Sequence, residues 1–350
     1  MNSIKINASS SYNVYIGAGI LCDLGAISAK VIGSGTVAVI SDSNVWPFYG
    51  EIVKMILHDS GLHVVSYVFP AGEDSKNTQT YISLLNFLAE NELTRSDLIV
   101  ALGGGVVGDL AGFAAATYLR GIQYIQIPTT LLAMVDSSVG GKTAIDLPSG
   151  KNLAGAFYQP SAVICDTDLL RSLPEEVYRE GCAEIIKYAI LFDRGLFAHL
   201  EEHGLSFDKE AVISKCIAFK SDVVVQDEFD TGYRHLLNFG HTIGHAVEYL
   251  SHFTLSHGNA VAIGMSVVTR AAAYNALCDH DTMQRILTLL DQFQLSTHTD
   301  FSADCLCTCA YSDKKRSGND IHLIIPKEIG QCTIQSIPIT ELKSFIEAGL

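Results

Sequence analysis

The stretch Leu98-Ile99-Val100-Ala101-Leu102-Gly103-Gly104-Gly105-Val106-Val107-Gly108-Asp109 decides the fold class. Its first five residues are apolar, as in a strand that is buried on both faces, and the glycines that follow fit the pattern G-x-G-x-x-G. Such glycines let the backbone at the start of a helix approach a pyrophosphate. The stretch therefore favours a dinucleotide-binding α/β domain. Glycine-rich turns also occur for packing reasons, and this one lies far from the N-terminus, unlike the first turn of an ordinary dinucleotide fold.

Apolar β-branched runs and helical patterns alternate around this stretch. Continuous apolar strands separated by helices predict a parallel sheet that is covered on both faces. The further predicted strands are 37–42, 64–70, 124–128 and 162–166, and the predicted helices between them are 48–60 and 78–91.

The character of the chain changes after Pro174, where most segments favour helices. We therefore expect an α/β nucleotide-binding domain at residues 1–173 and a mainly α-helical domain at residues 174–350. The predicted helices of the second domain are 176–201, 208–228, 236–250, 258–276 and 282–293, with one short strand at 321–326.

Composition limits the possible functions. The 350 residues are 48% apolar and carry a net charge of −15, which argues against general nucleic-acid binding. The nine scattered cysteines and the absence of a signal-peptide pattern predict a cytoplasmic protein. The longest apolar stretch, Leu98–Leu119, contains five glycines and Asp109, so no membrane span is expected.

Histidines gather near residue 240. His241 and His245 are four residues apart in a predicted helix and share one face, and His257 follows after a short gap. Such an arrangement is typical of a catalytic zinc site with an open coordination position. The residue after His241 is Thr242, where a zinc peptidase has glutamate, so a peptidase is not expected.

Several cations stand beside glycine, asparagine or apolar residues rather than in charge runs, which in an acidic protein predicts a pocket for a small anion. Glu184 precedes Lys187 by three residues in a predicted helix, so it is either half of a helical i,i+3 salt bridge or the carboxylate that completes a His-His-Glu zinc site. Asp42 and Glu73 follow strands and are candidates for accepting hydrogen bonds from ribose hydroxyls. The cations are Lys142, Lys151, Lys187, Lys220 and Arg234.

Together these motifs resemble the 3-dehydroquinate synthases, the zinc- and NAD-dependent cyclases of the shikimate pathway. The resemblance implies a Rossmann-like domain plus a helical domain, an active site in the cleft between them, and a homodimer. The matching motifs are Gly103–Asp109, Pro128–Asp146, Gly150–Pro160, Ala183–Tyr188, Leu236–Tyr249, His257–Met265 and Asp313-Lys314-Lys315.

The resemblance also implies roles for individual residues. The metal ligands are expected to be Glu184, His241 and His257, with zinc or cobalt as the ion, and His245 is then an acid–base group that faces the substrate. Arg120 is expected to reach the phosphate of a neighbouring subunit. NAD contacts are expected from Asp42, Glu73, Lys76, Gly104, Gly105, Asp109, Thr129, Thr130, Lys142 and Lys151. Contacts with the substrate are expected from Lys142, Asn152, Lys187, Lys220, Arg234, Asn238, Lys314 and Asp136.

The implied substrate is 3-deoxy-D-arabino-heptulosonate 7-phosphate, which would be oxidised transiently by NAD, lose phosphate, be reduced again and close to 3-dehydroquinate. Two other classes of enzyme are weighed against this: a sugar phosphate cyclase that makes a valiolone or an inosose, and a metal-dependent glycerol-type dehydrogenase. A non-catalytic NAD-binding protein is a third possibility. Three positions depart from the family pattern: Asp230, Asn259 and the pair Glu176-Val177.

Overall fold

The structure, a computed structural model, describes residues 2–310, 316–317 and 320–350. The chain folds into two compact units. The first comprises residues 1–174 and 209–229, and the second comprises residues 175–208 and 230–350.

A sheet of mainly parallel strands is the centre of the first unit. Among the described residues, seven strands pair in the order β1-β2-β9-β6-β5-β3-β4, and only β1 is antiparallel to its neighbour. The inner strands are mainly apolar, as expected for strands whose two faces are both covered by helices. The predicted parallel sheet is thus confirmed. The strands are β1 (Asn2–Ile6), β2 (Tyr12–Gly17), β3 (Thr36–Asp42), β4 (His63–Phe69), β5 (Leu98–Gly103), β6 (Gln123–Pro128) and β9 (Ala162–Asp166).

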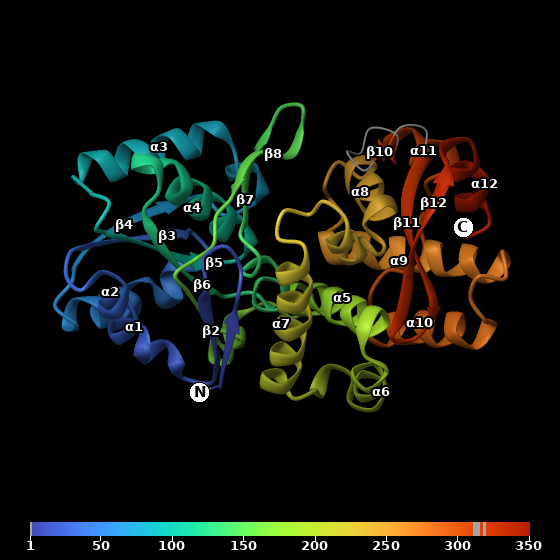
Figure 1. The fold of residues 1–350 in the computed structure, drawn as a ribbon, viewed down its shortest axis with the longest axis horizontal. Coiled ribbons are helices and arrows are strands. Elements are labelled where there is room, and N and C mark those ends of the chain that lie inside the picture. Colours follow the sequence, from blue (N-terminus) through green and yellow to red (C-terminus); the bar gives the residue numbers. More distant parts are fainter. Residues whose placement is uncertain (1, 311–315, 318–319) are drawn as a thin grey trace. The chain divides into compact units, whose positions relative to one another are not determined.

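Helices of the first unit lie on the two faces of this sheet (Figure 1). α1 (Leu24–Ile32) and α2 (Trp46–Asp59) pack on one face, and α3 (Thr78–Glu90) and α4 (Gly105–Thr117) pack on the other. α4 starts directly after β5, with Gly104 as its N-cap. Short helical segments connect the larger elements: η1 (Ile20–Asp23), η2 (Glu73–Ser75), η3 (Tyr118–Arg120), η4 (Ala133–Ser137) and η5 (Thr167–Ser172).

Two further elements complete the first unit. β7 (Lys142–Leu147) and β8 (Gly150–Phe157) form an antiparallel hairpin that packs against α4. α7 (Lys209–Gln226) comes later in the chain but packs on β1, β2 and η4, where Lys220 Nζ donates a hydrogen bond of 2.6 Å to the Asp136 carbonyl. The compact units therefore differ from the predicted domains 1–173 and 174–350 in this one helix.

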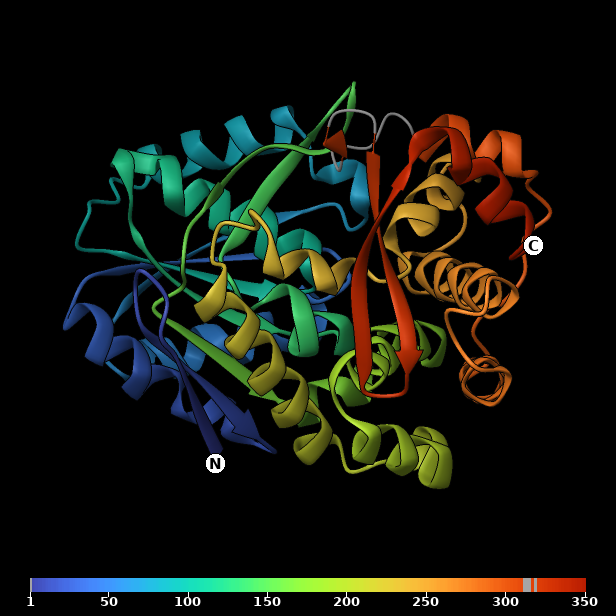
Figure 2. The ribbon, with the colours of Figure 1, turned by 45° about the vertical axis from the view of Figure 1, so that its right-hand side comes forward.

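The second unit is mainly helical and is built around α9 (His257–Tyr274), which is almost entirely buried. α5 (Glu175–Phe192), α8 (His241–Leu250), α10 (His280–Gln292) and α12 (Leu342–Glu347) all contact α9. The hairpin of β11 (Asp320–Glu328) and β12 (Gln331–Pro338), red in Figure 2, packs on α9 and α5. The remaining elements are α6 (Arg194–His203), η6 (Gly204–Ser206), η7 (Tyr233–Asn238), α11 (Ala303–Ala310), β10 (Arg316–Ser317) and η8 (Ile339–Glu341).

Two predicted helices of this unit have different bounds in the structure. The predicted helix 176–201 is two helices, because Asp193 has extended backbone and its carboxylate accepts hydrogen bonds from the amides of Gly195 and Leu196, which caps α6. The predicted helix 236–250 begins as an α-helix only at His241, because Gly240 before it is left-handed with φ 78°. The predicted strand 321–326 is confirmed as part of β11.

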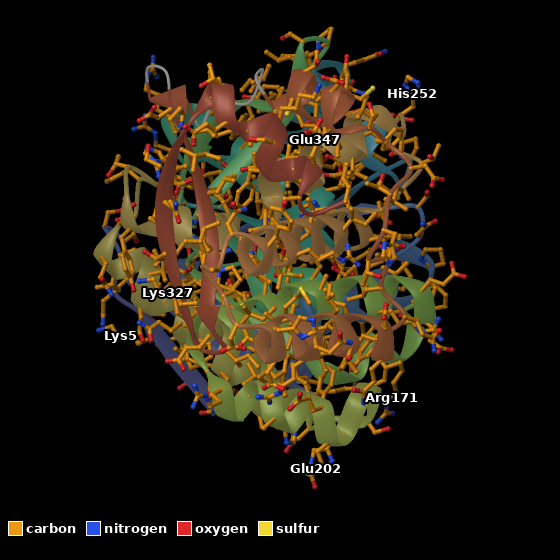
Figure 3. The ribbon with its side chains drawn as sticks, turned by 90° about the vertical axis from the view of Figure 1, so that its right-hand side faces the viewer. Lys5, Arg171, Glu202, His252, Lys327 and Glu347 are labelled. Carbon is orange, nitrogen blue, oxygen red and sulfur yellow. The ribbon has the colours of Figure 1, made fainter. Side chains whose placement is uncertain are left out.

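Surface charges of both signs are spread over the molecule. Figure 3 labels six exposed side chains: Lys5, Arg171, Glu202, His252, Lys327 and Glu347. Within the described residues, no helix is both long and apolar enough to cross a membrane.

Candidate active site

Three side chains from three helices of the second unit converge on one point. Glu184 lies on α5 and is 1% exposed, whereas His241 and His257 are the first residues of α8 and α9. The Nε2 atoms of His241 and His257 lie 3.5 and 3.6 Å from Glu184 Oε1. One donor atom from each residue lies within 4.8 Å of the other two. Two imidazole nitrogens and a carboxylate are the donor set of a zinc site with an open position.

The hydrogen bonds of the two imidazoles suit this arrangement. His241 Nδ1 lies 3.1 Å from the Phe239 carbonyl, and His257 Nδ1 lies 3.4 Å from Glu248 Oε2. Because these oxygens accept hydrogen bonds, each Nδ1 is placed to keep its proton, and each Nε2 is then the nitrogen that can offer a lone pair to an ion once it is deprotonated. These residues therefore fit a divalent metal ion.

The same contacts change the acidity of His257. Burial opposes a positive charge, but hydrogen bonds to Glu184 and Glu248 outweigh it and raise the pKa of His257 to about 9. A metal ion that binds Nε2 must therefore displace a proton at neutral pH.

Close helix packing places the three residues. A Cβ atom added to Gly258 would lie 2.3 Å from the Glu180 carbonyl oxygen, so glycine at this position lets α9 approach α5. A Cβ atom added to Gly264 would lie 1.9 Å from the Gly240 carbonyl oxygen, where α9 meets the start of α8. Glycine at positions 258 and 264 is therefore needed for α9 to pack closely enough on α5 and α8 to bring the three side chains together.

Two more of the predicted residues adjoin the cluster. Lys187 is 2% exposed and forms a close ion pair with Glu184 Oε2. The ring of His245, which is exposed, lies 5.5 Å from the ring of His241 and 6.3 Å from that of His257. The predicted i,i+3 salt bridge between Glu184 and Lys187 is thus present, and both of its side chains are buried. The same geometry leaves His245 accessible to a substrate.

The predicted NAD residues of the first unit form a charged network around Lys76. Its Nζ lies 2.8 Å from Glu73, 3.3 Å from Asp109 and 3.9 Å from Asp146, and Lys151 Nζ lies 3.9 Å from Glu73. Burial alone would lower the pKa of Lys76, but the charges of Asp109 and Glu73 outweigh it and raise that pKa. Burial raises the pKa of Asp109 to about 6 despite the nearby ammonium.

The glycine turn next to this network has the features of a phosphate cradle. Gly104 caps α4, and a Cβ atom added there would lie 3.0 Å from Thr130 Cγ2. The Thr129 hydroxyl is buried and has no hydrogen-bond partner among the described residues. Asp42 ends β3, and its carboxylate accepts hydrogen bonds from the amides of Asn44 and Val45. A buried hydroxyl without a partner beside a helix N-terminus fits a bound dinucleotide.

The other predicted substrate residues lie in both units. In the first unit, Lys220 is buried and its Nζ lies 2.9 Å from Asp136 Oδ1, whereas Lys142 is exposed at the start of β7. Asn152 has a left-handed backbone with φ 54°, and its amide donates to Asp146. Three residues complete the set: Arg120 is exposed in η3, and Arg234 is buried and Asn238 half-buried in η7 of the second unit. Lys314 lies outside the described residues.

Two residues of these networks were not singled out by sequence reasoning. Asp146 contacts Lys76 across 70 positions of the chain, and Glu248 contacts His257. Glu248 lies seven residues after His241 on the same helix, so helical periodicity contains a signal for it. Asp146 ends a recognised motif, but only the fold brings it to Lys76.

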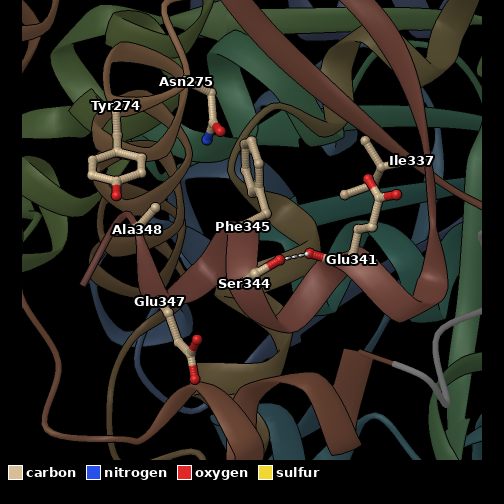
Figure 4. Close-up of a pocket in the computed structure, with 8 residues that line it drawn as sticks. All are labelled: Tyr274, Asn275, Ile337, Glu341, Ser344, Phe345, Glu347 and Ala348. Carbon is tan, nitrogen blue, oxygen red and sulfur yellow. Dashed lines mark hydrogen bonds between the residues drawn. The ribbon is translucent and has the colours of Figure 1, made fainter.

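A separate hollow of about 540 Å³ in the second unit contains none of the predicted residues (Figure 4). Its lining includes the carboxylates of Glu341 and Glu347, and no lysine or arginine lines it, so it is unsuited to a phosphate. The other lining residues are Tyr274, Asn275, Ile337, Ser344, Phe345 and Ala348.

Solved structures of sugar phosphate cyclases share this fold. A 2-deoxy-scyllo-inosose synthase, solved with carbaglucose-6-phosphate, NAD+ and Co2+, has a TM-score of 0.90 at 26% identity, with 100% of both chains covered. A 2-epi-5-epi-valiolone synthase from Streptomyces hygroscopicus, solved with NAD+ and Zn2+, has a TM-score of 0.89 at 25% identity, with 97% of this chain and 96% of that chain covered.

Sequence relatives are closer. A 3-dehydroquinate synthase from Clostridium acetobutylicum is 43% identical over 343 residues, which cover 96% of each chain. Residues 66–180 match the family model of the 3-dehydroquinate synthase N-terminal region, and residues 181–316 match that of the C-terminal region. The chain belongs to the 3-dehydroquinate synthase family.

Proposed function

We propose that this protein is a 3-dehydroquinate synthase that converts 3-deoxy-D-arabino-heptulosonate 7-phosphate to 3-dehydroquinate and phosphate, with NAD and a divalent metal, zinc or cobalt, as cofactors. The observation that carries the proposal is the convergence of Glu184, His241 and His257 beside Lys187 in a chain of this family. The net reaction breaks the carbon–oxygen bond to phosphate and closes a carbocycle. Because NAD is regenerated, the enzyme is a carbon–oxygen lyase.

The metal cluster and its neighbours have distinct tasks in this proposal. Glu184, His241 and His257 hold the metal ion. When bound, zinc supplies Lewis acidity to a substrate hydroxyl and NAD supplies a reversible hydride acceptor. His245 is exposed next to the cluster and takes the proton of that hydroxyl.

Buried cations give the substrate its orientation. Lys187, Lys220 and Arg234 are each at least 95% buried, and ion pairs with Glu184 and Asp136 hold the ammonium groups of Lys187 and Lys220 in place before a substrate binds. The substrate brings an anion at each end, a carboxylate and a phosphate, and holding both ends fixes the reactive conformer. We assign Lys142 and Asn152 to the same anions, together with Asn238 and Lys314.

The first unit supplies the nucleotide site in this proposal. Gly104 and Gly105 at the start of α4 allow a pyrophosphate to approach the helix N-terminus. The carboxylates of Asp42 and Glu73 accept hydrogen bonds from ribose hydroxyls. The rest of the proposed NAD set is Lys76, Asp109, Thr129, Thr130, Lys142 and Lys151.

The alternatives differ in substrate or in net chemistry. Cyclases that make an inosose or a valiolone act on substrates without a carboxylate, which would leave Lys220 and Arg234 together without an obvious use. A glycerol-type dehydrogenase has no leaving phosphate and no use for so many cations. A non-catalytic NAD-binding protein does not need the complete metal cluster.

The decisive experiment follows phosphate and NADH together in purified protein given the heptulosonate phosphate and a trace of NAD. We expect many equivalents of phosphate per NAD and no matching accumulation of NADH. A heptulose 7-phosphate without the carboxylate is the control substrate and should react much more slowly. Stoichiometric NADH without phosphate would instead identify a dehydrogenase, and a preference for the control substrate would identify another cyclase.

A further inference from the structure

Glu248 is a buried carboxylate whose side chain reaches a proposed metal ligand. It lies in the last turns of α8, is 5% exposed, and places Oε2 3.4 Å from His257 Nδ1. Its backbone carbonyl accepts hydrogen bonds from the Phe253 amide and the Ser251 hydroxyl, so the helix end that carries it is well held. A carboxylate is buried at a cost that a fixed, charge-assisted hydrogen bond can offset.

The two imidazoles of the cluster are supported differently. His241 Nδ1 faces a neutral backbone carbonyl, that of Phe239, whereas His257 Nδ1 faces the carboxylate of Glu248. A carboxylate that accepts a hydrogen bond from Nδ1–H fixes the orientation and the tautomer of the ring. It also makes Nε2 a stronger electron-pair donor to a metal ion. The support of His257 is therefore the stronger of the two.

Asn259 is one of the departures from the family pattern, and its contacts show whether it also supports the His257 ring. Its side-chain amide donates to Ser256 Oγ at 3.0 Å, and its carbonyl accepts from the Ser296 amide at 3.0 Å. These bonds tie the first turn of α9 to the segment after α10. Neither bond involves the His257 ring, whose Nδ1 instead faces Glu248.

We propose that Glu248 is the positioning residue of the metal site. It accepts a hydrogen bond from His257 Nδ1, orients the ring toward Glu184 and strengthens metal binding without itself contacting the ion. This inference rests on the proposed metal site. Glu248 also lies within 4.8 Å of donor atoms of His245 and His257, a grouping that could hold an ion of its own. In this proposal Nε2 of His257 binds the ion at Glu184 and Nδ1 keeps its proton, so His257 has no lone pair left for a second ion.

The test compares Glu248→Ala and Glu248→Gln with Tyr249→Ala, a control at the neighbouring residue of α8, which is 63% exposed. Zinc affinity is measured by competition with a chromophoric chelator, and the visible absorption of the Co2+-loaded protein reports the ligand geometry. We expect Glu248→Ala to weaken zinc binding by about 10- to 100-fold. Glu248→Gln keeps an acceptor without the charge, so we expect a smaller loss, and Tyr249→Ala should match the wild type.

Three outcomes separate the possibilities. An unchanged zinc affinity and Co2+ spectrum in folded Glu248→Ala would overturn the positioning role, and so would a second bound equivalent that disappears with Glu248. If Glu248→Ala fails to fold, the zinc affinity of Glu248→Gln is the test. An affinity equal to that of the wild type would show that the charge of Glu248 does not strengthen zinc binding. A wild-type protein that binds no zinc would instead refute the metal site itself.

Discussion

At the scale of single residues, we propose that the three histidines have two tasks: two are metal ligands and one is a proton carrier. His241 and His257 direct Nε2 at Glu184, whereas His245 is exposed and lies to one side. We therefore expect His241→Ala and His257→Ala to lose bound zinc. His245→Ala should retain zinc while its turnover falls by about 10²- to 10⁴-fold. Metal analysis after gel filtration, combined with the phosphate assay, checks both expectations, and full zinc content in both ligand variants would rule out this ligand set.

Asp109 illustrates the cost in stability of burying a carboxylate in a charged network. Its pKa in the folded protein, about 6, lies above its ordinary value of 3.8, so the folded state holds the proton more tightly than the unfolded state. The contribution of this group to stability is therefore present at low pH and is lost as the pH rises through about 6. Asp109→Asn removes this loss.

The matching prediction is that Asp109→Asn gains thermal stability relative to the wild type as the pH is raised from about 5 to about 8. Melting temperatures of both proteins at both pH values provide the test. An equal difference at the two pH values would mean that Asp109 does not titrate in this range. Weaker NAD binding by the same variant would agree with the proposed cofactor role.

Sequence reasoning at this scale found the histidines because they recur at helical spacing within a recognisable motif. It left two interpretations of Glu184 open, since a carboxylate three residues before a lysine is common on exposed helices. Only the family resemblance selected the metal ligand, and the structure contains the salt bridge as well: Glu184 Oε2 pairs with Lys187, and Oε1 lies near the two histidines. The partners of Lys76 could not be read from the chain, because Asp146 meets it only through the packing of the β7–β8 hairpin.

At the scale of elements, the crossing of α8 and α9 controls the metal cluster, because His241 and His257 begin these helices. Gly264→Ala would place a methyl group 1.9 Å from the Gly240 carbonyl oxygen, and the helices must separate to admit it. We expect a loss of about 1–3 kcal/mol in the free energy of unfolding, together with weaker zinc binding. Urea unfolding and the chelator competition measure the two effects. Unchanged stability would show that the crossing is looser than the structure indicates.

The elements that were predicted correctly have a strong local signal. The buried strands β3, β5, β6 and β9 are apolar runs between helices, and burial on both faces explains both their composition and their detection. The hairpin of β7 and β8 was not predicted, because the Lys142–Phe157 stretch has mixed composition and half-exposed residues. The break between α5 and α6 was not predicted, because a single residue, the α6 N-cap Asp193, interrupts an otherwise continuous helical pattern.

At the scale of the whole molecule, the order of elements along the chain does not predict that α7 packs in the first unit, although the segments before and after it belong to the second. Sequence patterns place residues 209–229 among helices of the second half, and their mixed surface does not reveal the strands that they cover. The hydrogen bond from Lys220 to the Asp136 carbonyl depends on this return. A division of the chain at residue 173 therefore assigns the sheet and the helices of the proposed metal site to the correct units. It assigns Lys220, a proposed substrate contact on α7, to the wrong one.

The last prediction concerns Arg120 and the homodimer that the family resemblance implies. Leu119 and Arg120 have left-handed backbones, with φ 49° and 66°, and the Leu119 carbonyl accepts a hydrogen bond of 2.8 Å from Arg95 Nε. Two successive non-glycine residues in this conformation are strained, and such strain is often found at functional sites. Arg120 is exposed, and we propose that its guanidinium contacts the phosphate in the active site of a neighbouring subunit.

If Arg120 acts across the interface, inactive Arg120→Ala and inactive Lys142→Ala subunits should complement each other. Each mixed dimer then has one site with both groups intact and one site with neither. Random exchange makes half of the dimers mixed, so about a quarter of the wild-type activity should return. Differently tagged subunits establish that exchange has occurred, and each variant alone is the control. Proven exchange without recovery, or a protein that sediments as a monomer under assay conditions, would place Arg120 in its own subunit's site or outside the reaction.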